Sequence, residues 1–384
     1  LLSILSAFAA AACLGRLIYG LTQDRFAAAA SGMTFLAIPY VLKWSSYMRI
    51  DLLALALSLA GLACLARPRM GRRGFLAGAL LLIAAIFTRQ SYALAAPLAA
   101  FVWTLFRDRR RALALAGWVG GGSVLLFLLL NSLTGGGFFV HVVQANVNEF
   151  GLERLEWHWR DVRHVIPGLL ILGGGALWLS PGKPGTRPLV APYLVGAAAS
   201  AATIGKIGSN VNYLLELCAA LSLAAGVALA WSRARPQRRL LQVIVLGLLV
   251  FQVGRLLEKT FNSVIPELNE RRAAQAELRQ LAGWVASAPG PVLADEHMGM
   301  IALAGRPLEL QPFEMTQLAW AGLWDQGPLL ERIRRKEFSL ILIHDFGGYP
   351  VYKERWTAEM LAAIEQNYRF ERALGGTRVY RPGP

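Results

Sequence analysis

The stretch Lys43-Trp-Ser-Ser-Tyr-Met-Arg-Ile-Asp51 separates two apolar runs, at about 26–42 and 52–66. It predicts a short polar corner between two membrane helices. A charged side chain at the end of a membrane helix is costly unless it has a partner or lies in a wet, protein-lined cavity. The charges of Arg49 and Asp51 therefore need an explanation.

Two interpretations of this corner remain open from the residues alone. In the first, Trp44 and Tyr47 belong to an aromatic belt at the membrane surface, and Arg49 extends toward the headgroups. In the second, Arg49 and Asp51 form part of a polar site at that surface. The second is favoured where other polar corners on the same side of the membrane are also unusual.

The rest of the chain has the composition of a polytopic membrane protein. Its 384 residues are 55% hydrophobic and only 16% charged, with a mean hydropathy of +0.44. The formal net charge of +15 would also suit a nucleic-acid-binding protein. However, the arginines occur in short clusters between apolar runs, as in the cytoplasmic loops of membrane proteins, so nucleic acid is not expected as a partner. The cysteines fall inside apolar segments and suggest neither disulfides nor zinc.

Apolar runs of helical length predict about ten transmembrane helices. Several are shorter than the roughly 20 residues that usually span a bilayer, so their ends must extend into the flanks or the helices must be short. The runs lie at about 1–21, 26–42, 52–66, 74–88, 92–106, 112–131, 163–180, 189–205, 213–231 and 240–256.

The connections between these runs alternate between two kinds. One kind is basic, and its members are Arg67, Arg69, Arg72 and Arg73; Arg107, Arg109, Arg110 and Arg111; Lys183 and Arg187; Arg233, Arg235, Arg238 and Arg239. The other kind is polar but sparsely basic, at 43–51, 88–91, 132–162 and 206–212. Because basic loops stay in the cytoplasm, the sparse loops and everything after residue 257 are expected on the periplasmic or extracellular side.

After the last apolar run the composition becomes that of a small soluble α/β domain. We therefore predict two domains, a polytopic membrane domain over 1–256 and an extramembrane α/β domain over 257–384. The second is expected to begin with a charged helix at 263–287. Its predicted strands are 291–294, 308–310, 339–343, 370–374 and 378–381, and its predicted helices are 316–323, 327–336 and 357–367.

Two further segments carry residues that could do chemistry. The segment 138–162 mixes aromatics with carboxylates and histidines and predicts an amphipathic helix in the outer interface. No pair of histidines has the i, i+4 spacing of a helical zinc site, so we predict no metal site there. Asp295-Glu296-His297 follows a predicted strand; it suits either a catalytic cluster or the polar end of that strand.

Two more outer corners carry unusual polar residues. Arg89, in Phe87-Thr-Arg-Gln-Ser91, lies between two apolar runs, where an arginine can hold a lipid phosphate through its guanidinium fork, or simply extend to the headgroups. The stretch Lys206-Ile-Gly-Ser-Asn-Val-Asn-Tyr-Leu-Leu-Glu216 gathers amides, a phenol and a carboxylate, which suit the hydroxyls of a sugar. Helix capping by its asparagines is the alternative. The substrate-binding candidates are Arg49, Arg89, Gln90, Lys206, Asn210, Asn212, Tyr213 and Glu216, and the catalytic candidate is Asp51.

Nearly the whole chain resembles the bacterial membrane glycosyltransferases of the C superfamily, which include protein O-mannosyltransferases and lipid A aminoarabinose transferases. The resemblance rests on loose motifs rather than a strict signature. They are the corner Pro39-Tyr-Val-Leu-Lys-Trp-Ser-Ser-Tyr-Met-Arg-Ile-Asp51, Thr88-Arg-Gln90, Gly208-Ser-Asn-Val-Asn-Tyr213, and the C-terminal Trp324-Asp325, Tyr368 and Val379-Tyr-Arg-Pro382.

The resemblance implies transfer of a sugar, with inversion, from a polyprenyl-phosphate donor at the outer face of the bacterial inner membrane. Asp51 is similar to the acidic residue of the family's second outer loop, and Arg89 to its phosphate-contacting cation. The family's main catalytic carboxylate lies in the first outer loop, after the first helix. Since Leu1 already resembles the second helix, we expect the first helix and loop to be missing, and with them the main catalytic Asp.

Other functions remain open at this point. A transporter or flippase for a lipid-linked sugar would place charged residues near mid-membrane depth. A scaffold would tolerate loss of Arg49, Asp51 and Arg89. The sequence leaves open the sugar, the acceptor (protein, lipid or cell-wall glycan), and whether a divalent cation bridges the phosphate; it shows no complete ligand set for one.

Overall fold

The computed structural model describes residues 1–47, 49–67, 69–146, 148–179, 185–235, 237, 239–345 and 352–384. Lys183 and Arg238, two members of the basic loops, lie outside these residues. The chain divides into two compact units, of which the first contains residues 1–130 and 150–265 and the second residues 131–149 and 266–384. Residues 131–149, which the sequence assigned to the membrane domain, thus belong to the second unit, and residues 257–265 belong to the first.

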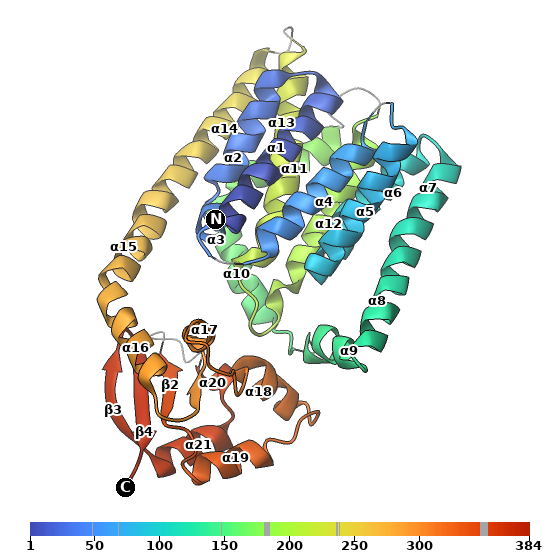
Figure 1. The fold of residues 1–384 in the computed structure, drawn as a ribbon. Coiled ribbons are helices and arrows are strands. Elements are labelled where there is room, and N and C mark those ends of the chain that lie inside the picture. Colours follow the sequence, from blue (N-terminus) through green and yellow to red (C-terminus); the bar gives the residue numbers. More distant parts are fainter. Residues whose placement is uncertain are drawn as a thin grey trace. The chain divides into compact units, whose positions relative to one another are not determined.

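The first unit is built of helices, and each of the ten predicted apolar runs is helical in it. Figure 1 shows α1, α2, α4 and α13 side by side, in agreement with the contacts between them. The helices are α1 (Leu2–Thr22), α2 (Arg25–Ala37), α3 (Pro39–Ser45), α4 (Asp51–Leu65), α5 (Arg72–Thr88), η1 (Gln90–Ala93), α6 (Ala95–Leu105), α7 (Arg109–Ala116), η2 (Gly117–Gly121), α8 (Gly122–Leu133), α10 (Leu152–Val165), α11 (Pro167–Leu179), α12 (Arg187–Ala202), η4 (Thr203–Gly205), η5 (Val211–Leu214), α13 (Leu215–Arg233), α14 (Arg239–Lys259) and η6 (Thr260–Val264).

Among the described residues, five helical segments are long and apolar enough to cross a membrane. They are Leu2–Thr22, Arg109–Leu133, Arg187–Gly205, Val211–Arg233 and Arg239–Ala273. The pair α2 and α3, bent by 66°, would make a sixth if it counts as one span. The chain is therefore a helical protein of the membrane-spanning type. The ten predicted spans are not confirmed, since α4, α5, α6 and α11 have only 15, 17, 11 and 13 residues, which is short for a bilayer about 30 Å thick.

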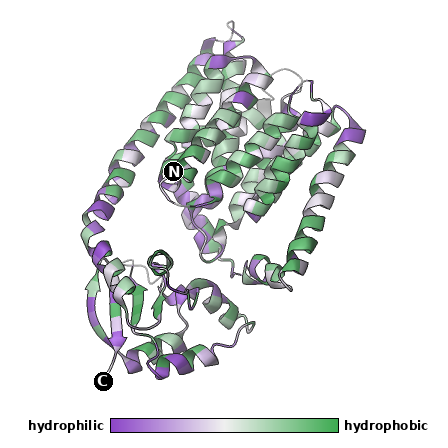
Figure 2. Ribbon diagram, in the orientation of Figure 1, coloured by the Kyte–Doolittle hydropathy of each residue, from purple (hydrophilic) through white to green (hydrophobic). Residues whose placement is uncertain are grey.

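The interior of the first unit is packed through small residues. Figure 2 shows hydrophobic residues along most of these helices and hydrophilic residues gathered mainly near their ends. Helices α4 and α5 approach so closely that a Cβ atom at Gly61 would lie 3.0 Å from the carbonyl oxygen of Gly78. Helix α13 is buried along almost its whole length. Close helix packing through glycine and alanine holds this unit together.

The prediction of one amphipathic helix over 138–162 was wrong. The segment forms α9 (Gly137–Val142), the short turn η3 (Gln144–Asn146) and α10. Before α10 the backbone pairs elsewhere: Phe150 forms an antiparallel bridge with Lys206, and the amide of Gly151 donates to the carbonyl of Gly205 at 2.9 Å. A helix cannot continue through residues whose backbone groups pair with a distant segment.

The second unit contains a four-stranded sheet of order β1-β2-β4-β3, in which β1 and β2 are parallel and the other pairs antiparallel. Its elements are α9, η3, α15 (Ile265–Ala273), α16 (Gln275–Ser287), β1 (Val292–Ala294), α17 (Met298–Leu303), α18 (Pro312–Trp320), α19 (Gly327–Arg334), β2 (Leu340–His344), α20 (Tyr352–Arg355), α21 (Ala358–Asn367), β3 (Tyr368–Leu374) and β4 (Thr377–Pro382). The predicted strand at 308–310 was wrong, since these residues pair with no strand and Leu308 is 54% exposed.

Both faces of this sheet are covered. Along β2, Ile341 and Ile343 belong to one hydrophobic core with Trp356, whereas Leu340 and Leu342 belong to the other. This alternation follows from the two-residue period of a strand. Strands β3 and β4 are joined through Gly375 and Gly376, at φ 56° and 71°, which is the left-handed backbone of a tight hairpin turn.

Candidate functional site

Asp51 is the centre of a buried polar cluster in the first unit. It is the first residue of α4, and it is only 3% exposed. Its Oδ2 accepts a hydrogen bond from Trp44 Nε1 at 2.9 Å, and its Oδ1 accepts one from Asn212 Nδ2 at 2.8 Å. The guanidinium of Arg89 forms an ion pair with the same carboxylate. Three side chains from three separate segments thus point at one carboxylate.

The bend before Asp51 brings Trp44 into place. Helix α2 ends at Ala37, Ile38 is extended, and Pro39 begins α3 at an angle of 66°. The corner that follows is tied to α1, because Ser3 Oγ donates to the carbonyl of Arg49 at 3.0 Å and accepts from its amide at 3.3 Å. The position of Asp51 at the start of α4 also favours its negative charge through the helix dipole.

Arg89 lies between a carboxylate and an aromatic ring. It follows α5 in extended conformation, and its side chain is 12% exposed. Its guanidinium carbon lies 4.5 Å from the centre of the Tyr213 ring. Such a contact stabilises a desolvated cation beyond its ion pair. The alternative of an arginine that only extends toward the headgroups does not fit this burial.

Glu216 lies deeper along the same helices. It is 4% exposed, and its Oε1 lies 3.4 Å from the hydroxyl of Ser58, about two turns into α4 from Asp51. Its Oε2 and the hydroxyls of Tyr92 and Tyr193 are buried and have no hydrogen-bond partner among the described residues. Glu216 therefore extends the polar region inward without contacting Asp51 directly.

The other predicted binding residues do not join the cluster. Arg49 and Gln90 are exposed, and Lys206 is engaged through its backbone with Phe150. The side chain of Asn210 accepts from the amide of Val211 at 2.7 Å, so the capping alternative holds for this residue. Trp44, in turn, was not predicted as a site residue, since the sequence placed it only in the aromatic-belt alternative. Its place in the same corner as Asp51 was the available signal.

A second buried aspartate lies in the second unit, at the end of β1. Asp295 accepts hydrogen bonds from the amides of Glu296 and His344, at 2.6 and 3.0 Å, and from Trp356 Nε1 at 3.1 Å. Two of its three donors are thus backbone groups of the strand ends, as the polar-strand-end interpretation of Asp295-Glu296-His297 requires.

Two histidines lie beside Asp295. His297 Nε2 and His344 Nδ1 lie 2.8 and 3.0 Å from the hydroxyl oxygen of Thr377, and their ring centres are 5.3 Å apart. Burial lowers the pKa of both imidazoles below its usual range. In the part of the chain that the structure describes, no three His, Cys, Asp or Glu side chains are placed to hold a metal ion.

Comparison with other proteins adds no relative to this picture. No protein-family model matches the chain, and no curated protein matches it. The interpretation of the site therefore depends on its geometry and on the motifs quoted above. That geometry offers one carboxylate in contact with a cation, an amide and an indole, with a phenol ring against the cation.

Proposed function

We propose that this protein is a membrane glycosyltransferase that moves a sugar, with inversion, from a polyprenyl-phosphate donor to an acceptor hydroxyl. The observation that carries the proposal is the ion pair of Asp51 and Arg89, enclosed by Trp44, Asn212 and Tyr213 at one end of an apolar helical unit. Inverting transfer needs a carboxylate for the acceptor proton and a cation for the departing phosphate, and this cluster supplies both.

The pairing of the two charges suggests how the donor would engage them. In the structure Arg89 is the counter-charge of Asp51. A lipid phosphate that binds the guanidinium would compete with Asp51 for it, since arginine matches phosphate oxygens with its planar fork. The carboxylate then becomes available to accept a proton.

The bond changes in the proposed step balance with these two residues. In this step Asp51 takes the role that the resemblance gives to a carboxylate of the first outer loop: the acceptor hydroxyl loses its proton to Asp51, and its oxygen attacks the anomeric carbon from the face opposite the phosphate. The bond between that carbon and the phosphate oxygen breaks, and polyprenyl phosphate leaves with its charge stabilised by Arg89. Asn212, Tyr213 and the more exposed candidates would contact the sugar.

The distribution of charge favours chemistry at one surface over transport through the membrane. Helix α4 has no charged residue between Leu52 and Leu65, and α13 has none between Leu217 and Ser232. Glu216, with Ser58, extends the polar region inward from Asp51, but a transporter for a lipid-linked sugar would need polar or charged groups along the whole path. We place the Asp51 cluster at the outer face of the bacterial inner membrane, with ten crossings and the α/β unit outside, on the alternation of basic and sparse loops.

The proposal can be tested with the full chain in lipid nanodiscs and a polyprenyl phosphate that carries a radiolabelled sugar. Cell-envelope fractions supply the acceptor. We expect label to move from lipid to acceptor, with release of polyprenyl phosphate. Binding of the donor without its consumption, together with movement of intact donor across proteoliposomes, would instead identify a transporter. If the chain neither binds nor consumes any such donor, only the scaffold function remains.

A further inference from the structure

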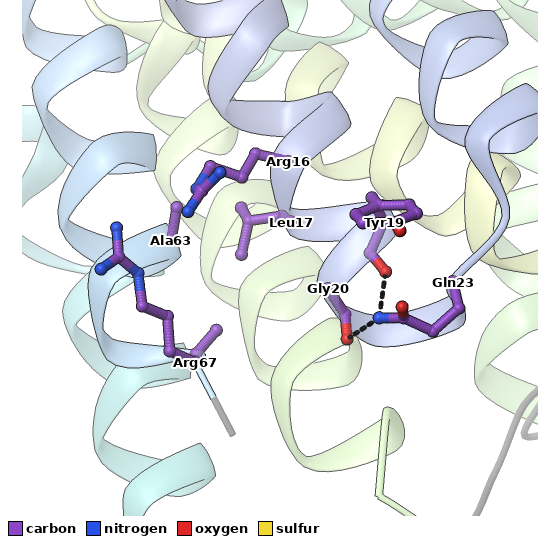
Figure 3. Close-up of a pocket in the computed structure, with 8 residues that line it drawn as sticks. Arg16, Leu17, Tyr19, Gly20, Gln23, Ala63 and Arg67 are labelled. Atoms are coloured by element: carbon purple, nitrogen blue, oxygen red, sulfur yellow. Dashed lines mark hydrogen bonds between the residues drawn. The ribbon is translucent and has the colours of Figure 1, made fainter. Parts of the chain in front are cut away.

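A pocket lies between α1 and α4 at their other ends, away from Asp51. It holds about 210 Å³, and Figure 3 shows the residues around it. The lining residues used here are Arg16, Leu17, Tyr19, Ala63, Ala66 and Arg67. Arg67 lies just after the end of α4, and the rise of a helix per residue puts it roughly 24 Å from Asp51, the first residue of that helix. The pocket is therefore separate from the Asp51 cluster.

Both arginines of this pocket are exposed and lack an anionic partner. Within the described residues, neither Arg16 nor Arg67 forms an ion pair or a hydrogen bond through its guanidinium. Two arginines of the basic loops, by contrast, have carboxylate partners: Arg233 lies 2.9 Å from Asp24, and Arg111 lies 3.2 Å from Asp108. Two unpaired cations on one pocket favour an anionic ligand.

The surface next to the pocket suits an acyl chain. On α1, Leu5 and Phe8 are 56% and 59% exposed, and they lie on the same helical face as Ala12 and Arg16. An apolar stripe thus leads along the helix to one of the two cations. The pocket itself is smaller than the roughly 300–1,000 Å³ of typical small-molecule sites, so it suits a phosphate group better than a nucleotide.

We propose that this pocket binds the phosphate of an anionic phospholipid, with the headgroup between Arg16 and Arg67 and an acyl chain along the exposed face of α1. Basic pockets between membrane helices bind such headgroups in other proteins. This inference does not depend on the proposed transfer reaction, since it concerns other residues at the other end of the helices.

The test counts phosphatidylglycerol molecules that stay bound to the full chain when it is released from mixed phosphatidylcholine nanodiscs into the mass spectrometer. We expect Arg16→Gln and Arg67→Gln each to weaken retention of one phosphatidylglycerol by about five-fold. Ala66→Leu keeps both charges but narrows the pocket, and should also reduce retention. The matched control Arg72→Gln removes an exposed arginine that does not line the pocket and should leave retention unchanged.

Three results would overturn the proposal. Equal retention by the wild type and both arginine variants would show that the pocket binds no lipid. If Arg72→Gln loses as much lipid retention as the two pocket arginine variants, and Ala66→Leu has no effect, the lipid is held only by general attraction between the basic loops and anionic headgroups. Displacement of the lipid by millimolar inorganic phosphate would identify a soluble phosphate as the ligand.

Discussion

The two units of this protein each contain an aspartate that is 3% exposed and accepts a hydrogen bond from a tryptophan indole. They differ in their other donors. The carboxylate of Asp295 accepts its other hydrogen bonds from two backbone amides of adjoining strand ends. The carboxylate of Asp51 instead accepts a hydrogen bond from the side chain of Asn212 and forms an ion pair with Arg89, and these two residues come from separate segments.

This difference shows which of the two carboxylates has a structural explanation. A buried acceptor that pairs with local backbone amides satisfies groups that the fold would otherwise leave unpaired, and so it stabilises the fold. A buried ion pair is a poor source of stability, because desolvation offsets most of its attraction. The Asp51 cluster is thus the better candidate for function, and Asp295 the better candidate for a structural clamp.

The largest expected effect is that of Asp51→Asn on sugar transfer. Asparagine keeps the shape of the side chain but cannot accept the proton, so we expect the rate to fall at least about 100-fold. The variant also leaves Arg89 without its counter-charge, which lowers the stability of the protein. Transfer is therefore assayed at a temperature at which size-exclusion chromatography shows that the variant is folded. Asp24→Asn is the matched control, since Asp24 also begins a helix and pairs with an arginine. Retained turnover in folded Asp51→Asn would leave Asp51 as a helix cap.

Arg89→Ala should weaken binding of the polyprenyl-phosphate donor by about ten-fold, since charge-assisted hydrogen bonds contribute roughly 1.5–3 kcal/mol each. Donor affinity can be measured directly by titration in nanodiscs. Arg233→Ala, which removes the partner of Asp24, serves as the control and should not alter donor binding. Unchanged affinity in Arg89→Ala would remove this residue from the donor site.

Asp295→Asn should show the opposite pattern. The NH2 group of the new asparagine side chain would face an indole or backbone N–H, which is also a donor, so we expect a loss of about 1–3 kcal/mol in the stability of the second unit on substitution of Asp295. Thermal unfolding of the full chain measures this loss. Transfer at a permissive temperature should stay at the wild-type level. A large loss of turnover in a stably folded variant would make Asp295 a functional residue and undo the comparison.

The smallest expected effect is a pH dependence from the histidines beside Asp295. Burial lowers the pKa of His297 and His344 in the folded state below 6.5, and the Arg355 charge lowers both pKa values further. The charges of Asp295 and Glu296 oppose this lowering at both histidines, and the charge of Asp345 opposes it at His344. Below about pH 6.5 the unfolded chain therefore binds more protons than the folded chain, and stability falls as pH decreases. Thermal unfolding between pH 5 and 8 checks this. Replacing both histidines by Gln should flatten the profile, and greater stability at acidic pH would contradict the assignment.

Much of the fold was predictable because apolar periodicity is local. All ten apolar runs are helical, and four of the five predicted strands are present. The number of spans was not predictable, since runs as short as those of α4 and α6, helices of 15 and 11 residues, do not by themselves show whether a helix crosses the bilayer. The break before α10 was also not predictable, because it depends on pairing with residues 205–206, far along the chain.

The candidate site was predictable only in part. Asp51, Arg89, Asn212 and Tyr213 are polar residues at the ends of apolar runs, which is why the sequence could mark them as candidates. Their contacts with one another are seen only in the structure. Which asparagine caps a helix and which one faces Asp51 depends on side-chain direction, which a sequence pattern does not show. The role of Trp44 likewise depends on the bend at Pro39.

The most direct test is the double variant Asp51→Asn, Arg89→Gln, which removes both charges of the buried pair at once. If the pair were structural only, removing one partner would be costly and removing both would be nearly neutral. We predict that thermal stability recovers toward the wild-type value in the double variant while sugar transfer stays at least about 100-fold reduced. Recovery of transfer together with stability would contradict the account, because the charges would then serve only to satisfy each other.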